Sequence, residues 1–86
     1  MDFAFDPAKS AANRAKHGID FSEAQRLWDD PHLVEIPART EDEPRFLVVG
    51  RIEDTHWSGV ITYRSGRVRI ISLRRSRPQE VESYES

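Results

Sequence analysis

The fold of this 86-residue chain is decided by the stretch from His56 to Arg77, HWSGVITYRSGRVRIISLRRSR. It holds two apolar runs, residues 60–63 and 68–73, joined through Ser65-Gly66, a dipeptide that favours the tight turn of a β-hairpin. A two-residue loop sets the cross-strand pairs, which are Arg64 with Arg67, Tyr63 with Val68, Thr62 with Arg69, Ile61 with Ile70 and Val60 with Ile71. We therefore predict two long antiparallel strands here.

This register sorts the hairpin side chains onto two faces, because side chains alternate along a strand. The face expected to pack on a core carries Ile61, Tyr63, Val68 and Ile70. The other face carries Thr62 with Arg64, Arg67 and Arg69, and Arg74, Arg75 and Arg77 follow at the strand end. Like charges opposite one another destabilise a ladder, and residues 55–79 contain no Asp or Glu. This surface indicates an anionic ligand; the alternative is a solvated face neutralised by acids from elsewhere in the fold.

Composition limits the remaining choices. The length allows one domain, residues 1–86, with a small core. The absence of cysteine and the scatter of the three histidines argue against disulfides and against a zinc site. No apolar run is long enough to span a bilayer, so a cytoplasmic protein that does not bind membranes is expected. The net charge is −2, yet all cationic residues except Lys9 and Lys16 are arginines, which favours nucleic acid as the ligand.

Two helices are expected before the hairpin. Asp6-Pro7 predicts the start of the first, which ends at His17 before Gly18. Its apolar stripe consists of Ala8, Ala11, Ala12 and Ala15. Asp20 predicts the cap of the second, which Asp29-Asp30-Pro31 ends. The apolar positions of this second helix are expected in the core, with Trp28 the largest contributor; they are Phe21, Ala24, Leu27 and Trp28.

Strands and one more helix complete the predicted fold. Residues 3–5 alternate like a short edge strand, residues 33–36 and 46–52 predict further strands, and residues 37–44 predict a charged loop between them. A turn is expected at Glu53-Asp54, and a terminal helix begins at residues 77–80. The order predicts an α+β domain: a short N-terminal strand, two helices, a four-stranded antiparallel meander and a C-terminal helix.

Several of these segments resemble the BrnT family, toxins of type II toxin-antitoxin pairs with a RelE-like fold. The similar segments are FDPAKSAANRAKHGIDFSEA at residues 5–24, Asp30-Pro31, RIISLRR at residues 69–75, Glu80 and Tyr84-Glu85. The resemblance implies a ribonuclease that blocks translation and that a BrnA-like antitoxin neutralises. It also implies contact with DNA only indirectly, through the antitoxin.

RNA can be cleaved without a metal when its 2′-hydroxyl attacks the neighbouring phosphorus and leaves a 2′,3′-cyclic phosphate. This chemistry needs a base, an acid on the leaving oxygen and a cation over the phosphorane. The candidate catalytic residues are Arg64, Arg69 and Arg74 as cations, with Glu80 and His17 as base or acid. The candidate RNA-binding residues are Arg67, Arg75, Arg77, Lys16 and Tyr84.

Structural roles compete with these assignments. His17 also suits a helix C-terminus, and Glu80 suits the first turn of a helix, because each charge complements the helix dipole there. Tyr84 can pack the last helix on the sheet, and His56 beside Trp57 is a third candidate for acid-base chemistry. We expect no cofactor and no catalytic metal, since the adjacent acid pairs suit turns and caps better. The alternative functions are a non-catalytic module that binds a protein or nucleic acid through the arginines, and a structural subunit that uses Phe46 and Trp57.

Overall fold

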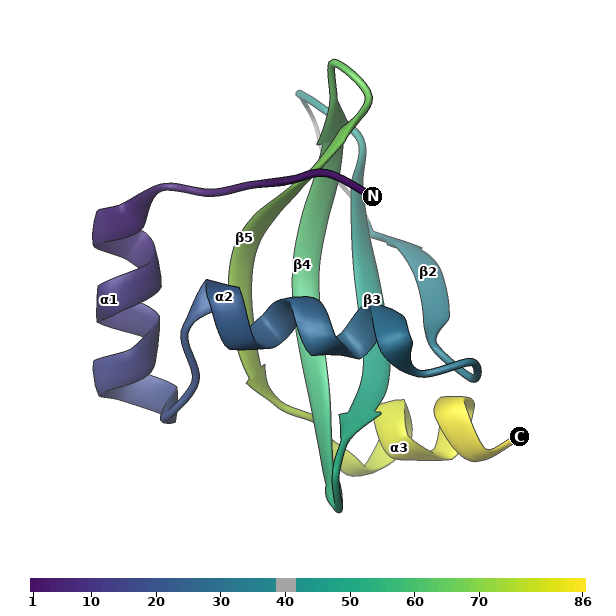
Figure 1. The fold of residues 1–86 in the computed structure, drawn as a ribbon. Helices are drawn as coiled ribbons and strands as arrows, with labels where there is room; N and C mark the ends of the chain where they lie inside the picture. The colour runs from purple at the N-terminus through teal and green to yellow at the C-terminus, as the bar shows by residue number, and fades with distance from the viewer. Residues whose placement is uncertain (39–41) are drawn as a thin grey trace.

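Five strands form one mixed sheet in the computed structural model, which describes residues 1–38 and 42–86 (Figure 1). The strands are β1 (Phe3–Ala4), β2 (Val34–Ala38), β3 (Arg45–Ile52), β4 (Thr55–Arg64) and β5 (Arg67–Arg75). They lie in the order β1-β5-β4-β3-β2, with β2 to β5 antiparallel to their neighbours and β1 parallel to β5. The α+β class is confirmed. The sheet is nevertheless mixed, and not a purely antiparallel meander, because β1 adds in parallel to the free edge of β5.

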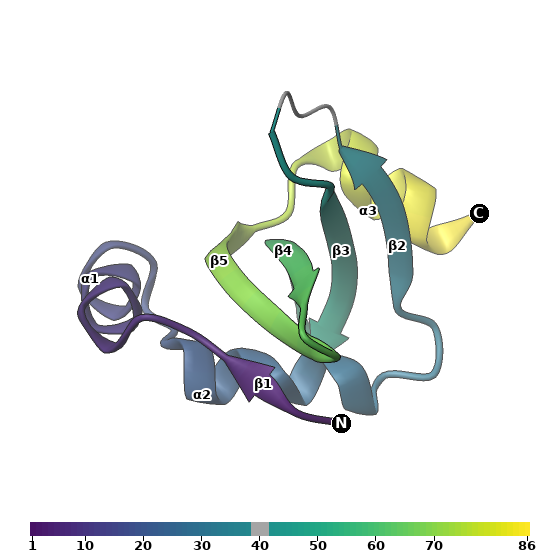
Figure 2. The same ribbon diagram turned by 90° about the horizontal axis from the view of Figure 1, so that it is seen from above.

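The helices lie on both faces of this sheet. They are α1 (Pro7–His17), α2 (Phe21–Ala24), which continues as the 3₁₀ helix η1 (Gln25–Asp29), and α3 (Pro78–Glu85). Figures 1 and 2 show α2 crossing one face, α1 beside β5, and α3 on the opposite face near one end of the strands. Of the predicted loop at residues 37–44, Pro37 and Ala38 belong to β2, and residues 39–41 lie outside the described residues.

The hairpin of β4 and β5 turns at Ser65 and Gly66, whose φ angles are 55° and 76°. Both angles lie in the left-handed region, as the twist of a two-residue hairpin requires. The predicted pairs from Arg64–Arg67 to Ile61–Ile70 are confirmed. The fifth pair is wrong, because a β-bulge follows Ile61 and Val60 lies opposite Ser72. The bulge turns the rest of β5, so that Leu73 points into the core and Arg74 lies on the other face beside Ser58.

The core lies between the sheet and α2. Its most buried large side chains come from α2, η1 and the central strands: Phe21, Leu27, Val48, Ile61 and Leu73. Trp28 packs against this core while remaining partly exposed, with its ring edge-to-face on Phe3. Tyr63 lies on the predicted face but is 48% exposed, since it stands near the hairpin tip beyond the helices.

The face that α1 buries is polar, contrary to the predicted alanine stripe, whose four members are exposed. Ser10 Oγ accepts a hydrogen bond from Phe21 N at 2.9 Å. Asn13 donates to the Ile19 carbonyl at 2.9 Å and accepts from Leu73 N at 3.1 Å. Helix α1 is therefore attached to β5 and to the start of α2 by hydrogen bonds to backbone groups that would otherwise be buried without partners.

Candidate functional site

A partly buried ion pair joins α3 to the end of β5. The carboxylate of Glu80 accepts hydrogen bonds from both terminal nitrogens of Arg74, each at 2.8 Å. Oε1 also accepts from Ser58 Oγ at 2.9 Å and from Arg77 N at 2.8 Å. The side chain of Glu80 is only 12% exposed. Ser58 and Arg74 lie side by side because they are cross-strand partners in β4 and β5. Glu80, in the first turn of α3, bonds to both side chains.

These contacts hold Glu80 in its ionised form. The hydrogen bond from Arg74 outweighs burial and, with those from Arg77 N and Ser58, lowers the pKa of Glu80 to about 2. The same bond raises the pKa of Arg74. A carboxyl group with such a pKa carries no proton to donate near neutrality and is a weak base. The acid-base role of Glu80 stays a prediction, and the geometry suits a group that positions Arg74.

A second cluster of arginines surrounds the tip of the hairpin. Arg64, Arg67 and Arg69 line a pocket of about 290 Å³ together with Ala4 and Ser65. Arg64 donates to Glu43 at 2.7 Å. Within residues 1–38 and 42–86, Arg67 and Arg69 form no ion pair. The acids that neutralise Arg64 and Arg74 thus lie outside residues 55–79, as the alternative of a solvated face neutralised by distant acids requires.

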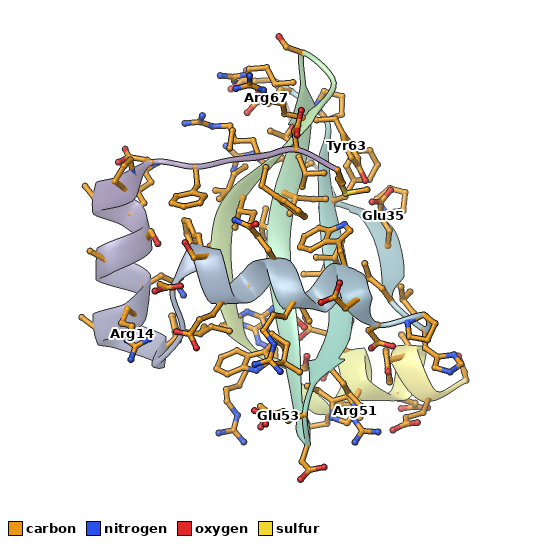
Figure 3. All side chains as sticks on the ribbon, in the orientation of Figure 1. Arg14, Glu35, Arg51, Glu53, Tyr63 and Arg67 are labelled. Carbon is orange, nitrogen blue, oxygen red and sulfur yellow. The ribbon has the colours of Figure 1, made fainter. Side chains whose placement is uncertain are left out.

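The two clusters lie at opposite ends of the sheet. Figure 3 shows Arg67 at the hairpin tip, far from Arg51 and Glu53 at the other end. Arg69 and Arg74 are five positions apart along β5, which corresponds to roughly 16 Å. The structure therefore does not bring the predicted catalytic residues into one constellation: Arg64 and Arg69 lie near the tip, and Arg74 and Glu80 lie at the strand end.

His17 and Lys16 belong to the strand-end region. The hydrogen bond between Leu73 N and Asn13 holds α1 beside β5, and the two elements run in the same direction (Figure 1). His17 follows Asn13 by about one helical turn, roughly 5.4 Å, and Arg75 follows Leu73 by roughly 6.6 Å along β5, so both lie beyond this hydrogen bond in the direction of the strand end. His17 is half-buried, and Lys16, Arg75 and Arg77 are exposed.

Tyr84 holds α3 against the rest of the fold. Its hydroxyl donates to Asp30 Oδ2 at 2.6 Å, a bond that raises the pKa of Tyr84. Burial raises the pKa of Asp30, but the hydrogen bonds from Tyr84, His32 N and Arg51 N together keep it below its ordinary value. Asp30 thus connects three segments of the fold by hydrogen bonds, a role that the sequence interpretation did not predict. The similarity of the Asp30-Pro31 segment to the BrnT family could have indicated that this residue matters.

His56 lies under α3, with its ring edge-to-face to Tyr84. Its Nε2 is 3.4 Å from a Glu85 carboxylate oxygen, but the geometry is not that of a hydrogen bond, and this buried atom has no hydrogen-bond partner in the described part of the chain. Trp57 packs against the core. The hydrogen bonds of the described residues include none between the His56 ring and an arginine, although the His56 carbonyl accepts from Ser76 N at 3.1 Å.

No group of three or more His, Cys, Asp or Glu side chains in residues 1–38 and 42–86 is arranged to hold a metal ion. None of the helices in these residues is both long and apolar enough to cross a membrane.

Comparison with known proteins decides the family. A family model described as "Ribonuclease toxin, BrnT, of type II toxin-antitoxin system" matches residues 5–80 of the 86. The chain belongs to the BrnT family. The match includes α1, the whole sheet from β2 to β5 and the first turn of α3, and so it includes both arginine clusters. A search of curated proteins finds no match.

Membership of the BrnT family makes the chain a ribonuclease toxin of a type II toxin-antitoxin system, with an antitoxin protein as its partner. The family assignment covers the class of activity and the class of partner. It assigns no role to individual arginines, to His17 or to Glu80.

Proposed function

We propose that this chain is an endoribonuclease that cleaves RNA without a metal ion, inhibits translation, and is neutralised by a BrnA-like antitoxin. We also propose that its α+β arrangement is RelE-like and that it acts in the cytoplasm, meeting DNA only through the antitoxin. The observation that carries the proposal is the concentration of arginines along β5 and its ends in a chain that the family defines as a ribonuclease toxin.

The arginines would bind the RNA backbone at two places. The tip cluster of Arg64, Arg67 and Arg69 offers guanidinium groups that suit phosphate oxygens. The exposed Arg75, Arg77 and Lys16 offer a second positive region about 16 Å away. A single strand that follows β5 could contact both, which would hold a phosphodiester beside the strand end.

In this proposal cleavage occurs at the strand end. His17 accepts the proton of a ribose 2′-hydroxyl, O2′ bonds to phosphorus, and the bond from phosphorus to O5′ breaks. The leaving O5′ takes a proton from a water molecule, and the hydroxide that this forms takes the proton from His17, which restores the base. Arg74 and Arg75 offset the charge that develops on the phosphorane oxygens, and Glu80 keeps the Arg74 guanidinium in one orientation. The product is a 2′,3′-cyclic phosphate.

The test is cleavage of a defined RNA in the presence of EDTA. The expected result is unchanged cleavage, with products that carry 2′,3′-cyclic or 3′-phosphate ends and 5′-hydroxyl ends. Loss of activity on chelation, or products with 5′-phosphates, would contradict the proposal and point to a metal-dependent nuclease.

A second candidate is a non-catalytic module that binds RNA or a protein through the same arginines. One observation favours it: the carboxylate of Glu80 already occupies the Arg74 guanidinium through two hydrogen bonds. Such a module would bind RNA with a strong dependence on salt but produce no cleavage products.

A further inference from the structure

The sheet face that carries Arg74 also carries a strip of aliphatic side chains. The register places Ile36 of β2 beside Leu47 of β3, and Leu47 beside Val60 of β4. All three side chains are half-buried. Because α2 packs on the opposite face, it does not shield them (Figure 2).

The neighbouring row of this face is covered by α3. That row contains Val49, which is fully buried, and Ser58, which is bonded to Glu80 at the start of α3. Within the described residues, α3 is the helix on this face, and it lies near one end of the strands (Figure 1). The strip therefore forms an apolar centre that the chain's own helices leave accessible.

Arginines border the strip. Arg45 and Arg69 lie on the same face in the adjoining row toward the hairpin tip, near the carboxylate of Glu43, and Arg74, which is paired with Glu80, lies on the other side. An apolar centre inside a charged rim is the usual anatomy of a protein interface. A partner that complements it would carry aliphatic side chains along one face and carboxylates beside them.

Nucleic acid fits the strip less well than protein does. Bases bind to protein surfaces largely by stacking on aromatic rings. The aromatic side chains of β3 and β4, which are Phe46, Trp57 and Tyr63, alternate onto the opposite face. The aliphatic strip offers buried area but no stacking surface.

We propose that the strip of Ile36, Leu47 and Val60, with its rim of Arg45, Arg69 and Arg74, is where the antitoxin docks through an amphipathic segment rich in Asp and Glu. This inference rests on the antitoxin partner implied by the family and adds the surface and the chemistry of the contact. A segment bound there covers Arg69 and Arg74, so it inhibits the toxin by excluding RNA from these arginines.

Amide hydrogen exchange of the intact chain, alone and with its cognate antitoxin, tests the location without any mutation. The expected result is slower exchange in residues 34–38, 45–49 and 58–62 on complex formation, with α1 unchanged. Protection confined to α1 and α2 would overturn the proposal.

Two substitutions sharpen the test. Ile36→Asn, on the edge strand, should raise the Kd for the antitoxin at least tenfold by calorimetry, because it places an amide in the apolar centre. Ala12→Asn, on the exposed side of α1, should leave it unchanged. An unchanged Kd for a folded Ile36→Asn protein would refute the docking surface.

Weaker binding of a 10-nucleotide RNA to Ile36→Asn, with unchanged antitoxin binding, would assign the strip to RNA instead. Neither readout uses cleavage, so an inactive toxin leaves this test intact.

Discussion

At the scale of single residues, Glu80 shows how a tertiary contact changes the chemistry of a side chain. In the sequence it is a carboxylate in the first turn of a helix beside a run of arginines. In the fold it accepts four hydrogen bonds from Arg74, Ser58 and Arg77, and its pKa falls to about 2. The contact favours a structural or positioning role over proton transfer.

The variant Glu80→Gln tests this role through stability. The folded-state pKa lies below the ordinary value of 4.5, so the contact stabilises the protein fully above about pH 4.5 and progressively less as pH falls toward 2. Removing the charge should cost roughly 1–3 kcal/mol in urea unfolding at pH 7, and the difference from the parent should shrink at pH 3. Glu82→Gln, exposed on the same helix, is the matched control and should change stability little. Equal stability of parent and Glu80→Gln at pH 7 would show that the ion pair contributes nothing.

The variant His17→Gln tests the proposed base. Losing a group that transfers a proton in the transition state should slow RNA cleavage by about 10²–10⁴-fold, while RNA binding by fluorescence anisotropy stays within about twofold. His32→Gln, at an exposed position away from β5, is the control. Cleavage at the parent rate by folded His17→Gln protein would remove His17 from the mechanism.

At the level of secondary structure elements, the spacing of apolar residues failed to predict how α1 packs on the rest of the fold. Alanine spacing predicted an apolar stripe, but the buried face holds Ser10 and Asn13. An amide side chain can satisfy both a carbonyl and an N–H of neighbouring segments, which alanine cannot. The helix therefore docks where backbone partners are available, and its small alanines face solvent.

The variant Asn13→Ala tests that attachment. It leaves the Ile19 carbonyl and Leu73 N without their partner and should cost about 2–4 kcal/mol in chemical denaturation. Lys9→Ala, on the exposed side of α1, should cost less than about 0.5 kcal/mol. We also expect faster amide exchange throughout α1 in Asn13→Ala, and a cost matching that of Lys9→Ala would count against the hydrogen-bonded attachment.

At the scale of the whole molecule, charge is separated although the net charge is only −2. Arginines gather at the hairpin tip and along β5, and two of them receive an internal carboxylate, Arg64 from Glu43 and Arg74 from Glu80. Among the described residues, Arg67 and Arg69 form no ion pair, and we predict that an anionic ligand binds at this end of the molecule.

The double variant Arg67→Ala, Arg69→Ala tests this distribution. RNA binding should weaken, and the slope of log K against log salt should flatten by about 1.5 units for two lost phosphate contacts. The double variant Arg26→Ala, Arg51→Ala removes the same charge from the opposite end of the sheet and should leave the slope nearly unchanged. Similar losses in both variants would mean that RNA responds to overall charge and not to the tip cluster.

The sequence by itself determined the features that depend on a few neighbouring residues. Asp6 and Asp20 cap their helices as expected, and Ser65-Gly66 turns the hairpin with the predicted register up to Ile61. The resemblance to the BrnT family could also be recognised from the sequence alone. Local backbone preferences and alternation suffice for these features, because hydrogen bonds within a turn or a helix end involve residues already close in the chain.

The tertiary structure alone decided how distant groups meet. The β-bulge after Ile61 reorients the end of β5, which puts Arg74 on the face that α3 covers. The same register separates Arg69 from Arg74 by roughly 16 Å and divides the predicted catalytic set into two clusters. Such contacts join segments that are far apart in the sequence. They depend on strand register and helix placement, and the fold sets both so that few buried polar groups lack a hydrogen bond. Because this condition applies to the whole molecule, no short stretch of sequence reveals it.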